Sequence, residues 1–299
     1  MKRFKIRLSI NTWGYLFMAP FIISFILFTA LPIAVSVGLS LFNYNMYESP
    51  VFIGLSNYKS LFMDDPEFSK ALRNTFVYAF TAAPISFVIS FLMAWLLNSF
   101  NRRLRNIMAL AFYAPSMTSG IALTIVWLYL FSGDRYGLIN HALIGLGIIH
   151  YPIQWTADTN IVFGIVIFIG IWMGTGTAFL TFLAGLQSLS PEIYEAGMID
   201  GIKNRYQELI YLTLPQMKPQ LLFGAITTSV AAFAVADIPM AVAGFPSPDY
   251  AAHTVVLHMN DYGFTRFEMG YASAISVVLF VVTFAFGRLF MKIFSSKEI

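Results

Sequence analysis

The 299-residue chain has no cysteine and few charged residues, and both absences restrict what it can do. Without cysteine there is no disulfide, no thiolate metal site and no thiol nucleophile. Aspartate, glutamate, lysine and arginine make up 11% of the residues, whereas a soluble domain has about 25%. This composition excludes a soluble globular protein. The basic residues lie in short clusters beside apolar runs, without the interleaved aromatic residues of a nucleic-acid site, so no nucleic-acid partner is expected.

Patterns typical of catalytic sites are also missing. The chain has no phosphate-binding GxxxxGK[ST], no HExxH, and no serine, histidine and carboxylate at one predicted membrane depth. The four histidines fall in or beside loops and lack helical metal-ligand spacing: His141, His150, His253 and His258. We therefore expect no catalytic residue, no metal site and no cofactor in this chain, which disfavours a membrane enzyme.

The 58% of hydrophobic residues gather in long runs. A transmembrane helix needs about 20 such residues. The first run is much longer than the apolar part of a cleavable signal, about 7 to 15 residues, so we interpret it as an uncleaved anchor, with kinks at Pro20 and Pro32. We predict an all-α integral membrane protein in which a domain of residues 13–290 lies between cytoplasmic segments 1–12 and 291–299. Its six transmembrane helices are predicted at 13–42, 72–97, 107–131, 161–186, 220–242 and 269–290.

Lysine and arginine in the loops set the orientation, because these residues are retained on the cytoplasmic side. If the amino terminus is cytoplasmic, 13 of the 18 fall in cytoplasmic segments. The other five lie outside: Lys59, Lys70, Arg73, Arg135 and Arg266. Both termini are therefore predicted to be cytoplasmic, as an even number of spans requires.

The cytoplasmic segment 187–219 carries strong helix signals. Ser190, Pro191 and Glu192 supply a side-chain cap, a proline at the first helical position and an acidic first turn. A short helix is predicted from Pro191 to about Asp200, and Gly201 provides the stop. A second amphipathic stretch then runs to Pro215 and Pro219, so two short helices are expected at an angle to each other.

This segment resembles the "EAA" loop of binding-protein-dependent ABC importer permeases. The matching residues are Glu195-Ala196-Gly197, Asp200-Gly201 and Leu214-Pro215. The carbohydrate branch of that family is also similar at Gly185-Leu186-Gln187, at Asn74-Thr75, and from Phe233 and Asp237 to Gly244 and Pro246. Two features depart from the family pattern: glycine at position 197 replaces alanine, and the spacing from Glu195 to Pro215 is one residue longer.

The resemblance implies a role and a set of partners. In that family the loop is a coupling helix that fits a groove on a separate ATPase, where Glu195 would pair with a basic residue. Two ATPase subunits would carry the ATP and magnesium, and this chain would pair with a second, homologous permease subunit in a bacterial or archaeal cell membrane. An extracellular solute-binding protein would deliver a sugar or oligosaccharide from the opposite face.

Polar residues inside the predicted spans are candidates for the solute pathway. Asp237 is expected to face a cavity or the bundle interior, where it either serves the solute or hydrogen-bonds a neighbouring helix. The resemblance to sugar permeases makes Trp172 a stacking surface and Thr177 a hydrogen-bonding group, with Thr228 in a similar position on span five. The glycines around Trp172, at 170, 174 and 176, also permit close helix packing. An ion-coupled secondary transporter is the alternative; it should show several intramembrane carboxylates, and only Asp237 qualifies.

Overall fold

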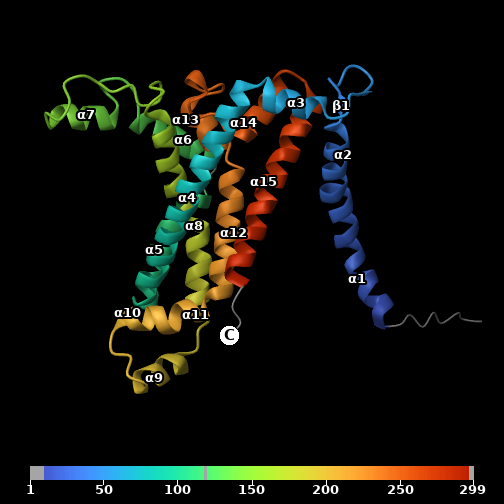
Figure 1. The fold of residues 1–299 in the computed structure, drawn as a ribbon. Helices are drawn as coiled ribbons and strands as arrows, with labels where there is room; N and C mark the ends of the chain where they lie inside the picture. Colours follow the sequence, from blue (N-terminus) through green and yellow to red (C-terminus); the bar gives the residue numbers. More distant parts are fainter. Residues whose placement is uncertain (1–9, 118–119, 296–299) are drawn as a thin grey trace, which may run out of the picture. The chain divides into compact units, whose positions relative to one another are not determined.

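The computed structural model describes residues 10–117 and 120–295, and the chain folds into two compact units. Unit 1 contains Met1–Asp64 and Met259–Val278, and unit 2 contains Asp65–His258 and Leu279–Ile299. Most of the ribbon is helical, and the strands among the described residues form one small hairpin in unit 1 (Figure 1).

Unit 1 begins with a helical segment built from α1 (Ile10–Phe25), η1 (Ile26–Ala30) and α2 (Leu31–Leu39). η1 is a π turn in which the Leu31 N–H donates to the Ile26 carbonyl. Pro32, which follows, has no N–H and its ring would clash with the carbonyl four residues earlier, so an irregular turn at this point is expected. The helix ends before the predicted boundary at 42, because Phe42 enters strand β1.

The hairpin of unit 1 pairs β1 (Phe42–Asn43) with β2 (Val51–Phe52), and α3 (Ser56–Met63) follows it. The Asn57 side chain donates to the carbonyls of Ser40 and Phe42, which fixes the hairpin on the end of α2. η4 (Asp261–Thr265) and the first part of α15 (Met269–Ser295) complete the unit. In α15, Gly270 packs against the Phe42 carbonyl, where a β-carbon would not fit.

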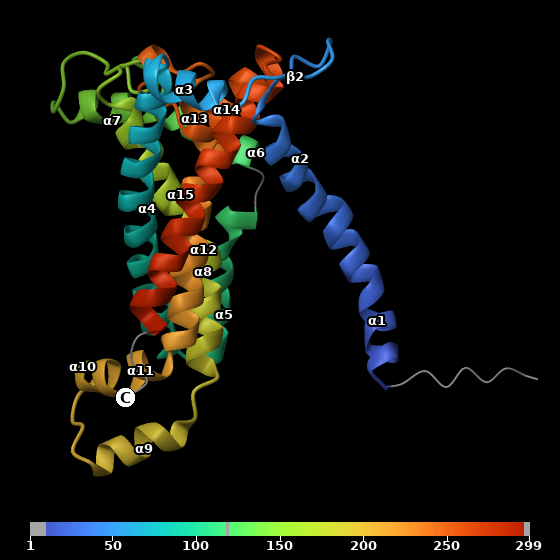
Figure 2. The ribbon, with the colours of Figure 1, turned by 45° about the vertical axis from the view of Figure 1, so that its right-hand side comes forward.

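Unit 2 is centred on two long helices, α4 (Pro66–Asn98) and α8 (Val162–Gln187), which lie side by side with α12 (Lys218–Phe233) (Figures 1 and 2). Ser86 and Ser90 of α4 donate to the Ile171 and Thr175 carbonyls of α8 at 3.4 and 2.9 Å. Gly170 of α8 packs directly on the Tyr78 hydroxyl, and Gly174 faces Ser86. The predicted close approach of a helix at these glycines is confirmed.

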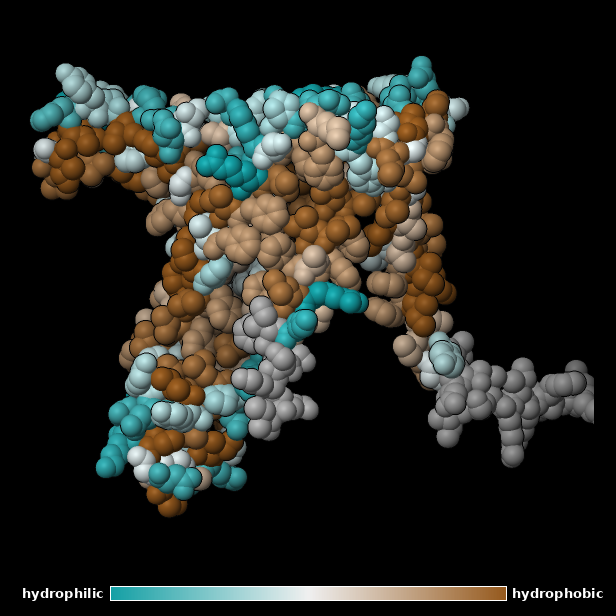
Figure 3. Space-filling view, viewed as in Figure 1, coloured by the Kyte–Doolittle hydropathy of each residue, from teal (hydrophilic) through white to brown (hydrophobic). Residues whose placement is uncertain are grey.

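α5 (Arg102–Met117) packs along α8, and the part of α15 from Leu279 onward packs on α4 and α12 through Phe286. The other elements of unit 2 lie toward the two ends of these long helices. One end carries α9 (Pro191–Ile199), α10 (Arg205–Glu208), η2 (Leu209–Thr213) and α11 (Leu214–Gln216). The opposite end carries α6 (Gly120–Leu130), α7 (Leu138–Gly145), α13 (Asp237–Ala243), η3 (Pro248–Tyr250) and α14 (Val255–Asn260). On the face shown in Figure 3, apolar side chains cover the middle of this unit and hydrophilic ones gather toward its ends, as a membrane protein requires.

Four of the predicted spans correspond to described helices that are long and apolar enough to cross a membrane. These are Phe17–Leu39, Pro66–Asn98, Val162–Gln187 and Met269–Lys292. The fifth predicted span, 220–242, is not continuous, because α12 and α13 are bent by 42° at a short break. The third, 107–131, falls on α5 and α6, and residues 118–119 between them lie outside the described residues. The chain is thus a multi-pass membrane protein with four or five spanning elements among its described residues.

Polar side chains at the start of α4 hold the segment from Pro248 to Asn260. Asp65 caps α4 by accepting from the Phe68 N–H at 2.8 Å, and its other carboxylate oxygen lies 2.9 Å from the His258 Nε2, with both side chains buried. The Asn74 amide donates to the carbonyls of Tyr250, Ala251 and His253, and the Thr75 hydroxyl accepts from the Val255 N–H. The Asn74-Thr75 pair therefore anchors this segment on α4.

Candidate functional site

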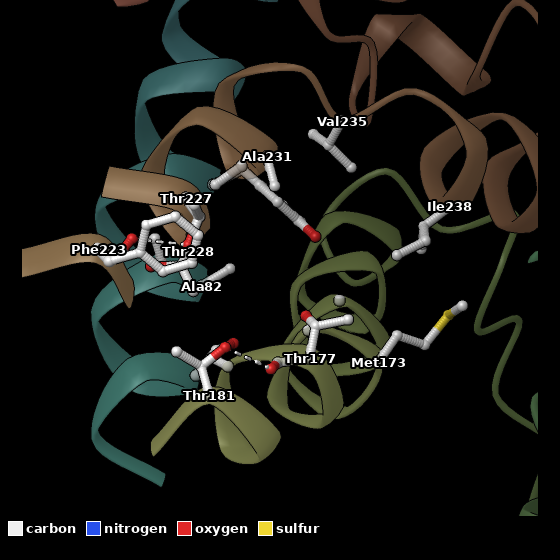
Figure 4. A pocket seen from close by; sticks show the side chains of 17 residues that line it. Ala82, Met173, Thr177, Thr181, Phe223, Thr227, Thr228, Ala231, Val235 and Ile238 are labelled. Carbon is white, nitrogen blue, oxygen red and sulfur yellow. Dashed lines mark hydrogen bonds between the residues drawn. The ribbon is translucent and has the colours of Figure 1, made fainter. Parts of the chain in front are cut away.

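A cavity of about 450 Å³ lies between α4, α8 and α12, and its size is within the range of ligand pockets. Figure 4 shows side chains of α8 and α12 around it, with Val235 and Ile238 at the end near the break before α13. The lining comprises Tyr78, Ala82, Ala83, Ser86, Gly170, Met173, Gly174, Thr177, Ala178, Thr181, Phe223, Thr227, Thr228, Ala231, Ala232, Val235 and Ile238.

Hydroxyl groups supply the side-chain polarity of this cavity, and none of the described residues that line it carries a formal charge. Thr227 and Thr228 donate to the carbonyls of Phe223 and Gly224 at 2.8 and 2.7 Å. Their oxygens keep lone pairs that accept hydrogen bonds from a ligand. Because a hydroxyl both donates and accepts, this lining suits an uncharged polyhydroxylated molecule better than an ion.

The structure brings Thr177 and Thr228 together in this cavity, as predicted, but it places Trp172 elsewhere. Trp172 lines a second, apolar cavity of about 400 Å³ between α4, α5 and α8. Its ring packs edge-on against Trp127, with the ring centroids 5.1 Å apart. Thr177 follows Trp172 by five residues on α8, and five residues turn an α-helix by one full turn plus about 140°. The two side chains therefore point to different sides of α8 and cannot line the same cavity wall. The prediction that they do is wrong.

Asp237 also differs from its predicted position. α12 ends at Phe233, and after the break Asp237 lies exposed in the first turn of α13, where the N-terminal end of a helix favours a carboxylate. Val235 and Ile238 on either side of it line the larger cavity, but Asp237 does not. The expectation that Asp237 faces a cavity or the bundle interior is therefore corrected, because the residue is exposed.

The contribution of α4 to the cavity, which includes Tyr78 and Ser86, was not predicted from the sequence. One signal was available: Tyr78, Ser86 and Ser90 are polar residues at helical spacing within an apolar run. Thr181 of α8, one turn after Thr177, was also overlooked, and its hydroxyl donates to the Thr177 carbonyl at 3.4 Å.

The segment from α9 to α11 begins and ends its first helix as predicted, with one difference. α9 starts at Pro191 and ends at Ile199, but the Ser190 side chain makes no capping hydrogen bond. Gly201 has φ +94°, the Ile202 N–H donates to the Gly197 carbonyl at 2.9 Å, and the Gly201 N–H donates to the Met198 carbonyl at 3.3 Å. These paired bonds form a Schellman motif, for which glycine is the preferred residue.

Gly197 allows α9 to pack closely against η2. A β-carbon at Gly197 would lie 2.7 Å from a methyl group of Leu212, so the glycine makes room for that side chain. Leu212 belongs to η2, a π turn that holds one more residue than an α turn, and the Tyr194 hydroxyl lies 3.3 Å from the Thr213 hydroxyl. The family pattern is left at two points, the glycine at position 197 and the one-residue longer spacing to Pro215. Both lie in the region where α9 packs against η2.

The rest of the predicted loop residues divide into an exposed group and a packed one. Glu195, Ala196 and Asp200 are exposed, as are the large side chains of Met198 and Ile199. Leu214 packs on the core formed by α4, α8 and α12, and Pro215 follows it in α11, which leads into α12. The outer face of α9 is therefore exposed. Its inner face packs on η2, which continues through α11 into α12, a helix that lines the cavity.

Comparisons with known proteins identify the family and the fold of this chain. Residues 86–298 match the family described as binding-protein-dependent transport system inner membrane component. The arabinooligosaccharides transport system permease protein AraP of Bacillus subtilis (strain 168) is 32% identical over 94% of this chain and 88% of its own length. The lactose transport system permease protein LacF of Rhizobium radiobacter is 29% identical over 95% and 94%. A bacterial ABC transporter involved in the import of the acidic polysaccharide alginate shares the fold, with a TM-score of 0.81, 20% identity and 96% of each chain covered.

Proposed function

The chain belongs to the family of binding-protein-dependent transport system inner membrane components, and on that premise we propose that it is the permease subunit of an ATP-driven importer of an uncharged sugar or oligosaccharide. One observation carries the choice of solute. The cavity between α4, α8 and α12 is lined by hydroxyl groups and apolar side chains, and its described lining has no charged residue.

The descriptions of the relatives support a carbohydrate as the transported solute, and the lining of the cavity supports an uncharged solute. AraP and LacF are described as transporting arabinooligosaccharides and lactose, both uncharged, whereas the structural neighbour imports an acidic polysaccharide. Burying a carboxylate without a partner is costly, so an acidic sugar needs a cationic side chain beside it. Thr177 instead offers a hydroxyl that can donate and accept, Thr181 and Thr228 offer acceptor oxygens for sugar hydroxyls, and Met173 and Phe223 offer apolar surface for a ring face.

We further propose that α9 is the coupling helix and that the loop 187–219 is cytoplasmic. Its exposed Glu195, Met198 and Ile199 suit a groove on a separate ATPase subunit, which would hold the ATP and magnesium. Two such ATPases, a second homologous permease subunit and an extracellular solute-binding protein would complete the importer. In this arrangement α5 and α6 together form a third span of six within a permease domain of residues 13–290, and both termini are cytoplasmic.

The proposal is tested by uptake into membrane vesicles from cells with and without the gene. We expect accumulation of labelled uncharged oligosaccharides to require ATP and the solute-binding protein, and to persist when a protonophore collapses the ion gradients. Uptake that stops with the protonophore and ignores ATP depletion would instead establish an ion-coupled secondary transporter.

Single cysteines test the topology, since the natural chain has none. Ser56→Cys and Thr159→Cys are exposed positions predicted to lie outside, and Lys203→Cys is an exposed position predicted to lie inside. An impermeant thiol reagent is expected to label the first two in intact cells and Lys203→Cys only after the cells are opened. Labelling of Lys203→Cys in intact cells would place the loop on the wrong side of the membrane for an ATPase.

Replacing the cavity hydroxyls tests the solute site. Thr177→Val and Thr228→Val keep the shape of each side chain and remove its hydroxyl, so each is expected to weaken uptake by about two- to tenfold, the value of one hydrogen bond. Thr159→Val, on an exposed loop, is the matched control. Uptake would be measured at equal expression over a range of solute concentrations. Unchanged concentration dependence in both cavity variants would move the solute site away from this cavity.

A further inference from the structure

We infer that Arg205 is a positioning residue that ties the proposed coupling loop to the end of α4, so that the loop holds two walls of the cavity instead of one. This inference rests on the proposed function. Its basis is a contact between residues 110 positions apart in the sequence, Arg205 and Trp95.

Arg205 makes two different contacts with Trp95. Its Nη2 donates to the Trp95 carbonyl oxygen at 3.0 Å, and its guanidinium carbon lies 4.4 Å from the centroid of the Trp95 ring. Arg205 is itself held at the start of α10, where the Asn204 side chain caps the helix by accepting from the Gln207 N–H at 2.8 Å. Trp95 is partly buried and packs against the core cluster that α4 and α8 form, which restricts the position of its ring.

The Trp95 carbonyl is available because α4 ends just after it. The Ser99 N–H, which an uninterrupted helix would direct to this carbonyl, donates instead to the carbonyls of Leu96 and Leu97. Carbonyls in the last turn of a helix need an outside donor, and a cation there also interacts favourably with the helix dipole. Arg205 therefore acts as a C-terminal cap for α4 that is supplied by the loop.

This contact gives the loop a second point of attachment to the cavity. The first runs through Gly197 and Leu212 into η2, α11 and α12. The second runs through Arg205 to α4, which supplies Tyr78, Ala82 and Ser86 to the cavity. When an ATPase moves α9, both helices are displaced together, and the cavity walls change position as a pair.

Arginine suits this position in a way that lysine does not. A planar guanidinium packs over an indole ring while an N–H group in its own plane donates to a carbonyl oxygen, whereas an ammonium group is a compact point charge without this fixed arrangement of donors. Arg205→Lys keeps the positive charge and removes the planar guanidinium group. It therefore distinguishes the specific contacts with Trp95 from a general effect of positive charge.

The link itself is tested first by a distance measurement. Spin labels on Leu96→Cys and Tyr206→Cys, both exposed, report the separation of α4 and α10 in the purified importer with and without ATP. One narrow distance distribution in both states is expected with Arg205, and a broad one with Arg205→Lys or Trp95→Leu. Lys203→Met is the matched control, because Lys203 is exposed nearby and only its backbone N–H makes a described hydrogen bond. A broad distribution with the natural residues would overturn the link.

The consequence for transport is tested in proteoliposomes. Arg205→Lys is expected to lower the solute moved per ATP hydrolysed by about tenfold, the effect of losing one charge-assisted hydrogen bond. Trp95→Leu keeps the carbonyl oxygen and loses only the ring under the guanidinium, so a smaller loss of about two- to fivefold is expected. Basal ATP hydrolysis and assembly should be unchanged, and the double variant should be no worse than Arg205→Lys alone. Normal coupling in Arg205→Lys, or additive losses in the double variant, would refute the inference. If the natural importer moves no sugar, the proposed function fails, while the distance measurement still decides the link.

Discussion

Gly201→Val is expected to abolish most transport while leaving the chain in the membrane. Gly201 has φ +94°, and a β-branched residue there is strained by about 1 to 3 kcal/mol. Nothing lies within 4 Å of the position where a β-carbon would be, so the cost is one of backbone conformation and not of crowding. The chain relieves it by giving up the Schellman motif, which turns α9 away from its present direction. We expect uptake to fall by about ten- to a hundredfold.

Two variants make this result specific. Gly201→Asn adds a side chain that tolerates the left-handed region, so it should retain most uptake. Gly145→Val adds the same side chain at a glycine with open space around it and no positive φ, and it should have no effect. Membrane abundance would be measured for each variant, together with co-purification of the ATPase. Normal uptake by Gly201→Val would contradict a coupling role for α9.

Ala231→Trp is expected to block the importer by filling the cavity. Ala231 lies on α12 and lines the cavity, so an indole ring at this position takes up a large part of the 450 Å³. We expect uptake to fall more than about tenfold, because the bound sugar and the ring compete for one space. Expression, thermal stability and basal ATP hydrolysis should remain, since the side chain enters a cavity and not the packed core. Ala231→Ser is the control at the same position.

A second tryptophan distinguishes the two cavities. Ala111→Trp fills the apolar cavity that Trp172 lines, and Leu110→Trp adds the same ring on the exposed side of α5. Both are expected to leave uptake within about twofold of the natural protein, because neither ring enters the cavity between α4, α8 and α12. If Ala111→Trp blocks transport and Ala231→Trp does not, the pathway runs beside Trp172 instead.

Features that depend on local interactions were predictable from the sequence. A run of about 20 apolar residues implies a membrane helix wherever it occurs, because every backbone group must be hydrogen-bonded within lipid. The start of α9 at Pro191 and its end before Gly201 follow from the same kind of reasoning, since a helix terminus is decided by the few residues around it. The family resemblance also lay in this loop, and the family is confirmed.

Only the tertiary structure decided which side chains share a cavity. Thr177 and Trp172 lie on one helix, yet their angular positions send them to different cavities, and the α4 residue Tyr78 joins Thr177 across a helix contact that no local pattern specifies. Asp237 lies outside the cavity because α12 ends at Phe233 and a new helix, α13, begins at Asp237. The contact of Arg205 with Trp95 depends on where two distant helices end, which is set by packing over the whole unit and not by the residues around either one.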